Sequence, residues 1–284
     1  MTKHFKAASL SILSLLLLSA AARADETVTE KFSKTYPLAA NGSVSLKNVN
    51  GNVTFEAWDR NEVQVDAEKK VRADDAAEAR EILGKVRIDV QAAASAVRVE
   101  TKMPKREDRG FWDLLSGRDA ASAGVTYRVQ VPRGAVVEVD NVNGSVHLTG
   151  SRGSGRLETV NGNIEVAGTA GALVLESTNG NIEVTRSEGT VKASTTNGNI
   201  EAELTRVAEG KELGFSTTNG GVTVRLPRDA RLSVDAATTN GRIDSELELG
   251  GLSSSRRHLT GTLNGGGGKL RIRTTNGSVE LDQI

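Results

Sequence analysis

The chain has 284 residues, with 36 basic and 36 acidic side chains, 3% aromatic residues and no cysteine. The balanced charge excludes a globally basic nucleic-acid-binding protein. The lack of cysteine excludes disulfide scaffolds and cysteine-ligated zinc sites. A chain of this length can bury a sizeable core, so packing and backbone hydrogen bonds must hold the fold together.

The first 24 residues are typical of a secretory signal peptide. Lys3 and Lys6 precede the apolar run 7–18, and an Ala-Arg-Ala cleavage motif ends at Ala24. The run is shorter than the about 20 residues that a transmembrane helix needs, and no later stretch is apolar enough to span a bilayer. We therefore predict an exported protein, periplasmic, secreted or at the cell surface. Its mature chain starts at Asp25 and carries 33 basic and 36 acidic side chains, a net charge of −3.

Residues 25–122 are predicted to form an irregular β region with one short helix. Alternating apolar residues on both sides of the helix indicate strands. Asp75 stands three residues before Glu78, as at a helix start, and Gly84 stands where a helix would end. We therefore expect a helix that begins after Asp75 and stops at Gly84.

A short insertion near residue 110 carries an unusual group of large apolar side chains. Phe111, Trp112, Leu114 and Leu115 follow a charged run at 105–109. Such a group either folds back to cover an open end of the fold or contacts a partner. These four residues are our candidate partner-binding residues.

From residue 123 to residue 284 the sequence repeats. Thr-Thr-Asn-Gly occurs four times, and successive Asn-Gly pairs from Asn143 to Asn276 are 18, 18, 18, 22, 21 and 36 residues apart. A period near 20 residues is typical of a solenoid, in which each coil stacks on the next. The final interval is twice 18, so we expect an irregular coil between Asn240 and Asn276.

Each coil is predicted to contain two short strands that meet at the Asn-Gly corner. Counted from the repeat Asn, apolar residues recur at positions −6, −4, +3 and +5. The side chains that point inward therefore change from even to odd positions at the corner. We expect Gly to supply a positive φ there and Asn to tolerate it. An antiparallel meander with Asn-Gly turns is the alternative, but equivalent positions match in every coil. The predicted structural corners are Asn143, Gly144, Asn161, Gly162, Asn179, Gly180, Asn197, Gly198, Asn219, Gly220, Asn240, Gly241, Asn276 and Gly277.

Stacking also predicts a column of acidic side chains at position +4. Glu165, Glu183 and Glu201 would lie about 5 Å apart and repel one another. They would therefore either bind a hard cation such as calcium or face solvent. The aspartate-rich calcium-binding repeat is absent, so we favour the solvated face and predict no metal site.

The sequence shows no catalytic or cofactor-binding motif. The mature chain has only His147 and His258 as histidines, and Gly-x-Ser-x-Gly is absent. The glycine run 265–268 is not followed by the Lys-Ser/Thr of a phosphate-binding loop. We therefore predict a protein without a cofactor that is not an enzyme.

Several motifs together resemble a known family. They are Val-Asn-Gly-Asn-Val at 49–53, Val-Gln-Val-Pro at 129–132, the serial Asn-Gly corners and the glycine-containing segment 260–270. The chain resembles, over residues 28–284, the bacterial putative-adhesin family of repetitive β-solenoid domains, whose function is unknown. The resemblance implies a right-handed, β-helix-like fold outside the cytoplasm and offers no catalytic residues.

We expect an all-β, single-chain, right-handed β-helix-like solenoid with coils of about 20 residues. The irregular region 25–122 and the repetitive region 123–284 would form one continuous unit. The expected function is that of a non-enzymatic adhesin-like or envelope scaffold and binding protein. Its partner would be an envelope protein, lipid or polysaccharide, and not nucleic acid. The alternatives are a polysaccharide-active β-helix enzyme and an envelope-stress sensor that binds a lipid or peptide through 111–115.

Overall fold

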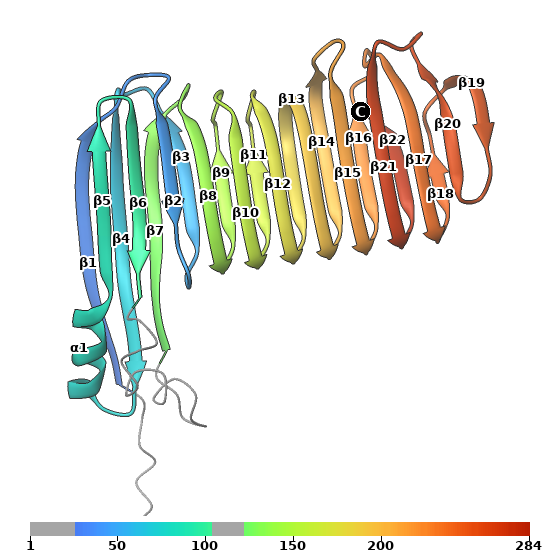
Figure 1. Cartoon of the computed structure of the whole chain (residues 1–284). Coiled ribbons are helices and arrows are strands. Elements are labelled where there is room, and N and C mark those ends of the chain that lie inside the picture. Colours follow the sequence, from blue (N-terminus) through green and yellow to red (C-terminus); the bar gives the residue numbers. More distant parts are fainter. Residues whose placement is uncertain (1–25, 104–121) are drawn as a thin grey trace, which may run out of the picture.

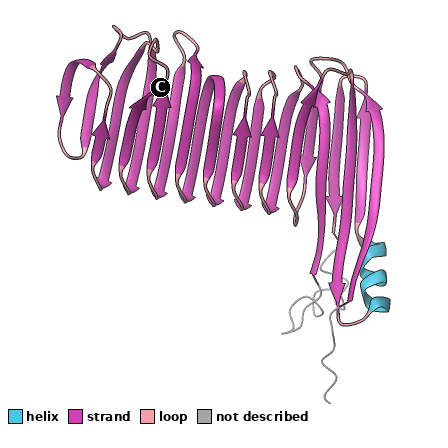
Figure 2. Cartoon of the chain, turned by 180° about the vertical axis from the view of Figure 1, so that it is seen from behind, coloured by secondary structure: helices cyan, strands magenta, loops and turns pink. Residues whose placement is uncertain are grey.

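The computed structural model describes residues 26–103 and 122–284. They form an all-β solenoid of two facing sheets, sheet A and sheet B, with one helix within these ranges (Figures 1 and 2). The predicted all-β solenoid is thereby confirmed. The predicted signal peptide 1–24 and the patch 111–115 lie outside the described residues.

Each coil gives one strand to each sheet. In spatial order, sheet A contains β1 (Glu26–Pro37), β4 (Glu62–Ala73), β7 (Ser122–Pro132), β3 (Val53–Trp58), β9 (Val146–Thr149), β11 (Ile164–Ala167), the first part of β13 (Ile182–Asn197), β14 (Ile200–Val207), β16 (Val222–Leu226), β22 (Val279–Gln283) and β18 (Ile243–Ser245). Among these strands, which belong to the described residues, only the pairs β1–β4 and β4–β7 are antiparallel.

Sheet B is parallel along its middle and antiparallel at both ends. In spatial order it contains β5 (Arg87–Ala93), β6 (Ala96–Lys102), β2 (Ser43–Lys47), β8 (Val136–Asn143), β10 (Gly155–Asn161), β12 (Ala172–Asn179), the second part of β13, β15 (Glu212–Asn219), β21 (Gly268–Asn276), β17 (Leu232–Asn240), β20 (His258–Leu263) and β19 (Leu249–Ser254). Parallel pairing of successive coils rules out the antiparallel meander.

The last coil does not stack in chain order. Strands β21 and β22 lie between β15 and β16 on one side and β17 and β18 on the other (Figure 1). The irregular coil expected before Asn276 is instead the antiparallel hairpin β19–β20, which pairs with the far edge of β17. Asn264, Gly265, Gly266 and Gly267 all have positive φ. This sharp reversal lets β21 pass to the other side of β17.

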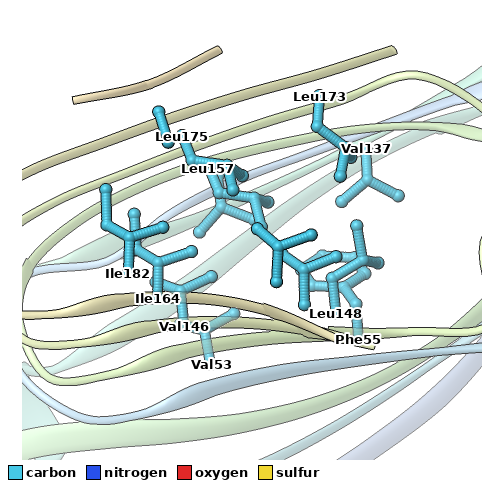
Figure 3. Close-up of a cluster of buried hydrophobic side chains, with 14 of the residues drawn as sticks. Val53, Phe55, Val137, Val146, Leu148, Leu157, Ile164, Leu173, Leu175 and Ile182 are labelled. Atoms are coloured by element: carbon cyan, nitrogen blue, oxygen red, sulfur yellow. The ribbon is translucent and has the colours of Figure 1, made fainter. Parts of the chain in front are cut away.

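The core lies between the two sheets. Leu157 and Leu175 of sheet B point toward Ile164 and Ile182 of sheet A (Figure 3). The predicted inward positions are buried in the coils, except at the end of the stack, where Ile243 is half-buried and Ser245 is exposed. Period-two alternation therefore identifies the core correctly.

Side chains join the coils at every Asn-Gly corner. The Nδ2 of each Asn donates to the Oδ1 of the preceding Asn in the stack at 2.7–2.9 Å, in the order Asn50, Asn143, Asn161, Asn179, Asn197, Asn219, Asn276 and Asn240. At position −2, a hydroxyl donates to the carbonyl of the preceding corner glycine, as Thr195 does to Gly180 O at 3.0 Å. The corner thus satisfies backbone groups that would otherwise lack partners.

The corner glycines are needed chiefly because neighbouring coils approach closely. A Cβ atom at Gly180 would lie 1.9 Å from Gly162 O. Among the seven repeat corners, φ is positive at Gly144 (135°), Gly198 (159°) and Gly220 (159°) but not at the other four, and it is positive at Gly51 (124°) in the first part of the chain. The expectation of a positive φ at every corner is therefore wrong, and the backbone carbonyl of the coil below excludes any side chain.

The helix α1 (Ala76–Lys85) lies against β1 and β4 at the end of the solenoid (Figure 1). The Asp75 side chain accepts hydrogen bonds from the backbone N–H groups of Ala77 and Glu78, as an N-cap does. The helix continues through Gly84, so the predicted stop at this residue is wrong. The helix ends one residue further on, at Lys85, and the Val86 N–H donates to Leu83 O.

A polar group lies inside the first coils. Tyr127 Oη and Thr101 Oγ1 are 2.7 Å apart, and Thr101 donates to Asn48 Oδ1 at 2.9 Å. The Asn48 side chain in turn donates to Val125 O at 3.0 Å. Burial raises the pKa of Tyr127 to about 12, while the hydrogen bond to Thr101 acts in the opposite direction.

We expect Tyr127 to ionise near pH 12 in the folded protein. Because its folded-state pKa lies above the usual 10.0, its contribution to stability is complete below about pH 10 and is lost as the pH rises toward 12. An absorbance titration of the wild type and Tyr127→Phe should show that the variant loses the phenolate transition near pH 12 and keeps that of Tyr36, whose pKa partial burial also raises. Ionisation of Tyr127 near pH 10 in folded protein would contradict its burial.

Candidate ligand-binding face

The outer face of sheet B changes charge along the stack. Its residues at position −3 are, from β8 to β21, Asp140, Glu158, Glu176, Ser194, Ser216 and Arg273. The face therefore runs from acidic through small hydroxyl side chains to basic.

A hollow of about 290 Å³ lies where the side chains of this face are small. We call it the Gly214 hollow. Its lining includes Glu176, Lys192, Ser194, Gly214, Ser216 and Arg271. Gly214 has no side chain and Ser194 and Ser216 are short. Longer side chains, among them Glu176, Lys192 and Arg271, surround them. The hollow thus arises because small residues stand at this point of an otherwise regular sheet.

Arg271 brings a positive charge to the hollow. It lies opposite Gly214 on one side and opposite Asp235 on the other. Asp235 pairs instead with Arg273, at 2.5 Å, and Lys192 pairs with Glu212 at 3.5 Å. Within residues 26–103 and 122–284, Arg271 has no ion pair. Its guanidinium is available to an anionic group.

Asp235 holds Arg273 in place at the edge of the hollow. The hydrogen bond from Arg273, and more weakly that from His258, keeps the pKa of Asp235 below its usual value, although partial burial opposes them. Arg273 also donates to Asp235 O at 2.9 Å. Asp235 is therefore ionised at neutral pH. Arg273 forms an ion pair with it, whereas Arg271 has no ion pair within the described residues.

A second, larger groove adjoins the hollow. It measures about 560 Å³ and shares Glu176 and Ser194 with the hollow. Its other lining residues include Glu158, Thr178 and Thr196. Together the two depressions follow the coils across sheet B, with carboxylates and hydroxyls at one end and Arg271 at the other.

The predicted acidic column lies on the opposite sheet. Glu165, Glu183 and Glu201 are in register on the outer face of sheet A. Glu165 contacts His147 at 3.0 Å and Glu201 contacts Arg225 at 2.5 Å. In the part of the chain that the structure describes, no three metal-ligating side chains are grouped to hold an ion. The cationic Arg225 partly offsets the repulsion at Glu201.

The other predicted residues are the Asn-Gly corners and the apolar residues of the insertion near residue 110. The corner Asn and Gly residues form the continuous column described above. Phe111, Trp112, Leu114 and Leu115 lie outside the described residues, so their role in partner binding stays a prediction.

Sequence reasoning missed the Gly214 hollow because it assumed that coils stack in chain order. That order would place Asp235 beside Gly214, whereas the insertion of the last coil brings Arg271 there. In chain order the outward position −5 reads Lys192, Gly214, Asp235 and Arg271. The missing side chain at Gly214 could indicate a depression, but the sequence places Asp235 and not Arg271 beside it.

Comparison with solved structures finds distant similarity. A putative cell adhesion protein from Clostridium sporogenes is 12% identical, with a TM-score of 0.33, and 90% of this chain and 100% of that chain are covered. A putative adhesin from Bacteroides fragilis is 10% identical, with a TM-score of 0.37, and the coverage is 90% and 97%. Similarity at this level carries no conclusion about a ligand. No curated protein matches the chain.

The repetitive region provides the family assignment. The Toastrack DUF4097 family matches residues 133–282, which is more than half of the 284 residues. This match covers the Asn-Gly coils from β8 to β22 and confirms the resemblance to a solenoid family of unknown function. The chain belongs to the Toastrack DUF4097 family.

Proposed function

We propose that this protein is an exported, non-enzymatic, adhesin-like binding protein that presents the outer face of sheet B to a polysaccharide of a cell envelope or cell surface. The observation that carries the proposal is the unneutralised Arg271 in a hollow on a rigid, polar face. The signal-peptide pattern at 1–24 supports export. In the described ranges, no helix is long and apolar enough to cross a membrane.

The face suits a ligand rich in hydroxyl groups. Carboxylates such as Glu158 and Glu176 accept hydrogen bonds, and Thr178 and Thr196 both donate and accept them. The stacked coils hold these side chains on strands joined by hydrogen bonds at every corner. A preformed face loses little conformational entropy on binding, which favours binding by many weak polar contacts.

The histidines support a non-enzymatic role. His147 lies on sheet A and His258 on β20 of sheet B. The His258 ring contacts Asp235 at 3.3 Å, but Ser255 hydrogen bonds to the backbone of His258 and not to its ring. This cluster therefore lacks the nucleophile–base pair of a serine hydrolase.

The proposal is tested by capture of labelled polysaccharide from bacterial cell envelopes that have been freed of protein and lipid. Ser194 lines both depressions, so Ser194→Arg should reduce capture by about tenfold. Thr126→Arg, which places the same side chain on the outer face of sheet A, is the matched control and should bind like the wild type.

Equal capture by all three proteins would contradict a role for sheet B. Capture of no polysaccharide by the wild type would contradict the proposed function. Shortening of the captured polymer, followed by size-exclusion chromatography, would show an enzyme instead and favour the polysaccharide-active alternative.

A further inference from the structure

The charged side chains around the Gly214 hollow leave one cation, and therefore room for one anionic group of a ligand. Lys192 and Arg273 already face Glu212 and Asp235, so Arg271 is the cation left for a ligand. A planar guanidinium binds a carboxylate through two parallel N–H···O bonds. The hollow is therefore matched to a single carboxylate beside Arg271.

The rest of the face disfavours a ligand with many negative charges. Asp140, Glu158 and Glu176 stand on adjacent strands about 4.8 Å apart in the direction away from Arg271. Arg156 contacts both Glu158 and Glu176, and Lys47 contacts Asp140 at 2.9 Å, so the carboxylates are only partly neutralised. A uniformly charged polyanion that followed the groove would meet this acidic row and be repelled.

The same row favours neutral sugar units. Hydroxyl groups of a sugar can donate to Glu158 and Glu176, which accept and do not donate when ionised. The hydroxyls of Ser194 and Ser216, which line the hollow, have no hydrogen-bond partner within the described residues. They can form hydrogen bonds with a sugar ring that lies between the acidic row and Arg271.

We infer that the Gly214 hollow binds a carboxylated sugar at the end of an otherwise neutral oligosaccharide. The carboxylate pairs with Arg271, the ring lies over Gly214 and the neutral units extend along the groove past Glu176. This inference rests on the proposed function and names the class of ligand that its face selects. One ion pair with a few hydrogen bonds and no aromatic platform gives weak binding, on the order of 1 mM for a single site.

Saturation-transfer NMR with the full mature protein tests the inference. Sialyllactose carries one carboxylated sugar on a neutral disaccharide, lactose lacks the carboxylate, and oligogalacturonate carries one on every unit. We expect sialyllactose to bind at least tenfold more tightly than either of the others.

Two variants locate the site. Arg271→Gln should weaken sialyllactose binding about tenfold without changing the weak signal of lactose. Gly214→Val fills the hollow with a side chain that strands favour and should also weaken binding. Arg128→Gln, a matched loss of charge from exposed Arg128 on sheet A, should bind like the wild type.

The outcomes separate this inference from the proposed function. If lactose or oligogalacturonate binds as well as sialyllactose, or if Arg271→Gln binds normally, the inference is wrong. If envelope polysaccharide is still captured through Ser194 in that case, the proposed function stands with another ligand. If neither sialyllactose nor envelope polysaccharide binds, both proposals fail.

Discussion

Replacing Gly180 by alanine should lower the free energy of unfolding by about 3 kcal/mol or more. The added Cβ would lie 1.9 Å from Gly162 O, a backbone atom that cannot rotate away. Relief of this clash requires the two coils to separate. Separation weakens the hydrogen bond from Asn179 to Asn161 and the one from Ser177 to Gly162 O, both of which join these two coils.

Urea denaturation of Gly180→Ala and Gly214→Ala would measure this effect. At Gly214 the nearest atom to an added Cβ is Lys192 Cγ, at the ordinary contact distance of 3.8 Å. This control removes a glycine from the same solenoid, and its stability should change by less than about 1 kcal/mol. Similar losses in both variants would show that close approach is not what requires glycine at the corner.

Truncating Phe215 to alanine should cost about 3–5 kcal/mol. Its ring is 2% exposed and is the largest side chain at position −4 of the repeats. In the stack it lies beside Ala193, the smallest residue of the neighbouring coils at this position. The ring therefore occupies space that the short neighbour leaves in the column.

A double-mutant cycle tests this complementarity. Ala193→Leu alone should overpack the column and cost about 1–3 kcal/mol, and Phe215→Leu alone should leave a cavity. The combined variant should be more stable than the sum of the single losses predicts, because the new leucine enters that cavity. Thermal unfolding of the four proteins gives the coupling, and strictly additive losses would disprove the shared space.

The coil interior could be predicted because it depends on local pattern. Ile164, Ile182 and Ile200 occupy the same position after the corner, and a strand that alternates in and out must bury all three. The helix start after Asp75 is likewise a local property of a capping side chain. The helix ends at Lys85, so Gly84 marks its end to within one residue.

The hollow could not be predicted because it depends on contacts between distant segments. Gly214 and Arg271 are brought together only by the position of the last coil. The repeated corners have nearly the same sequence, so the sequence of one corner does not specify which other coil stacks on it. The glycine turn that moves the chain past β17 has no counterpart in the other coils, and the period alone gives no sign of it.

The inserted coil also has a consequence for biosynthesis. A growing chain emerges with β17 before β21, yet in the finished stack β21 separates β17 from β15. The coils therefore cannot accumulate in the order of translation, as they can in a simple solenoid. Segment 268–283 must insert between strands that precede it in the chain. Completion of this part of the core is thus delayed until residues 268–283 have been translated.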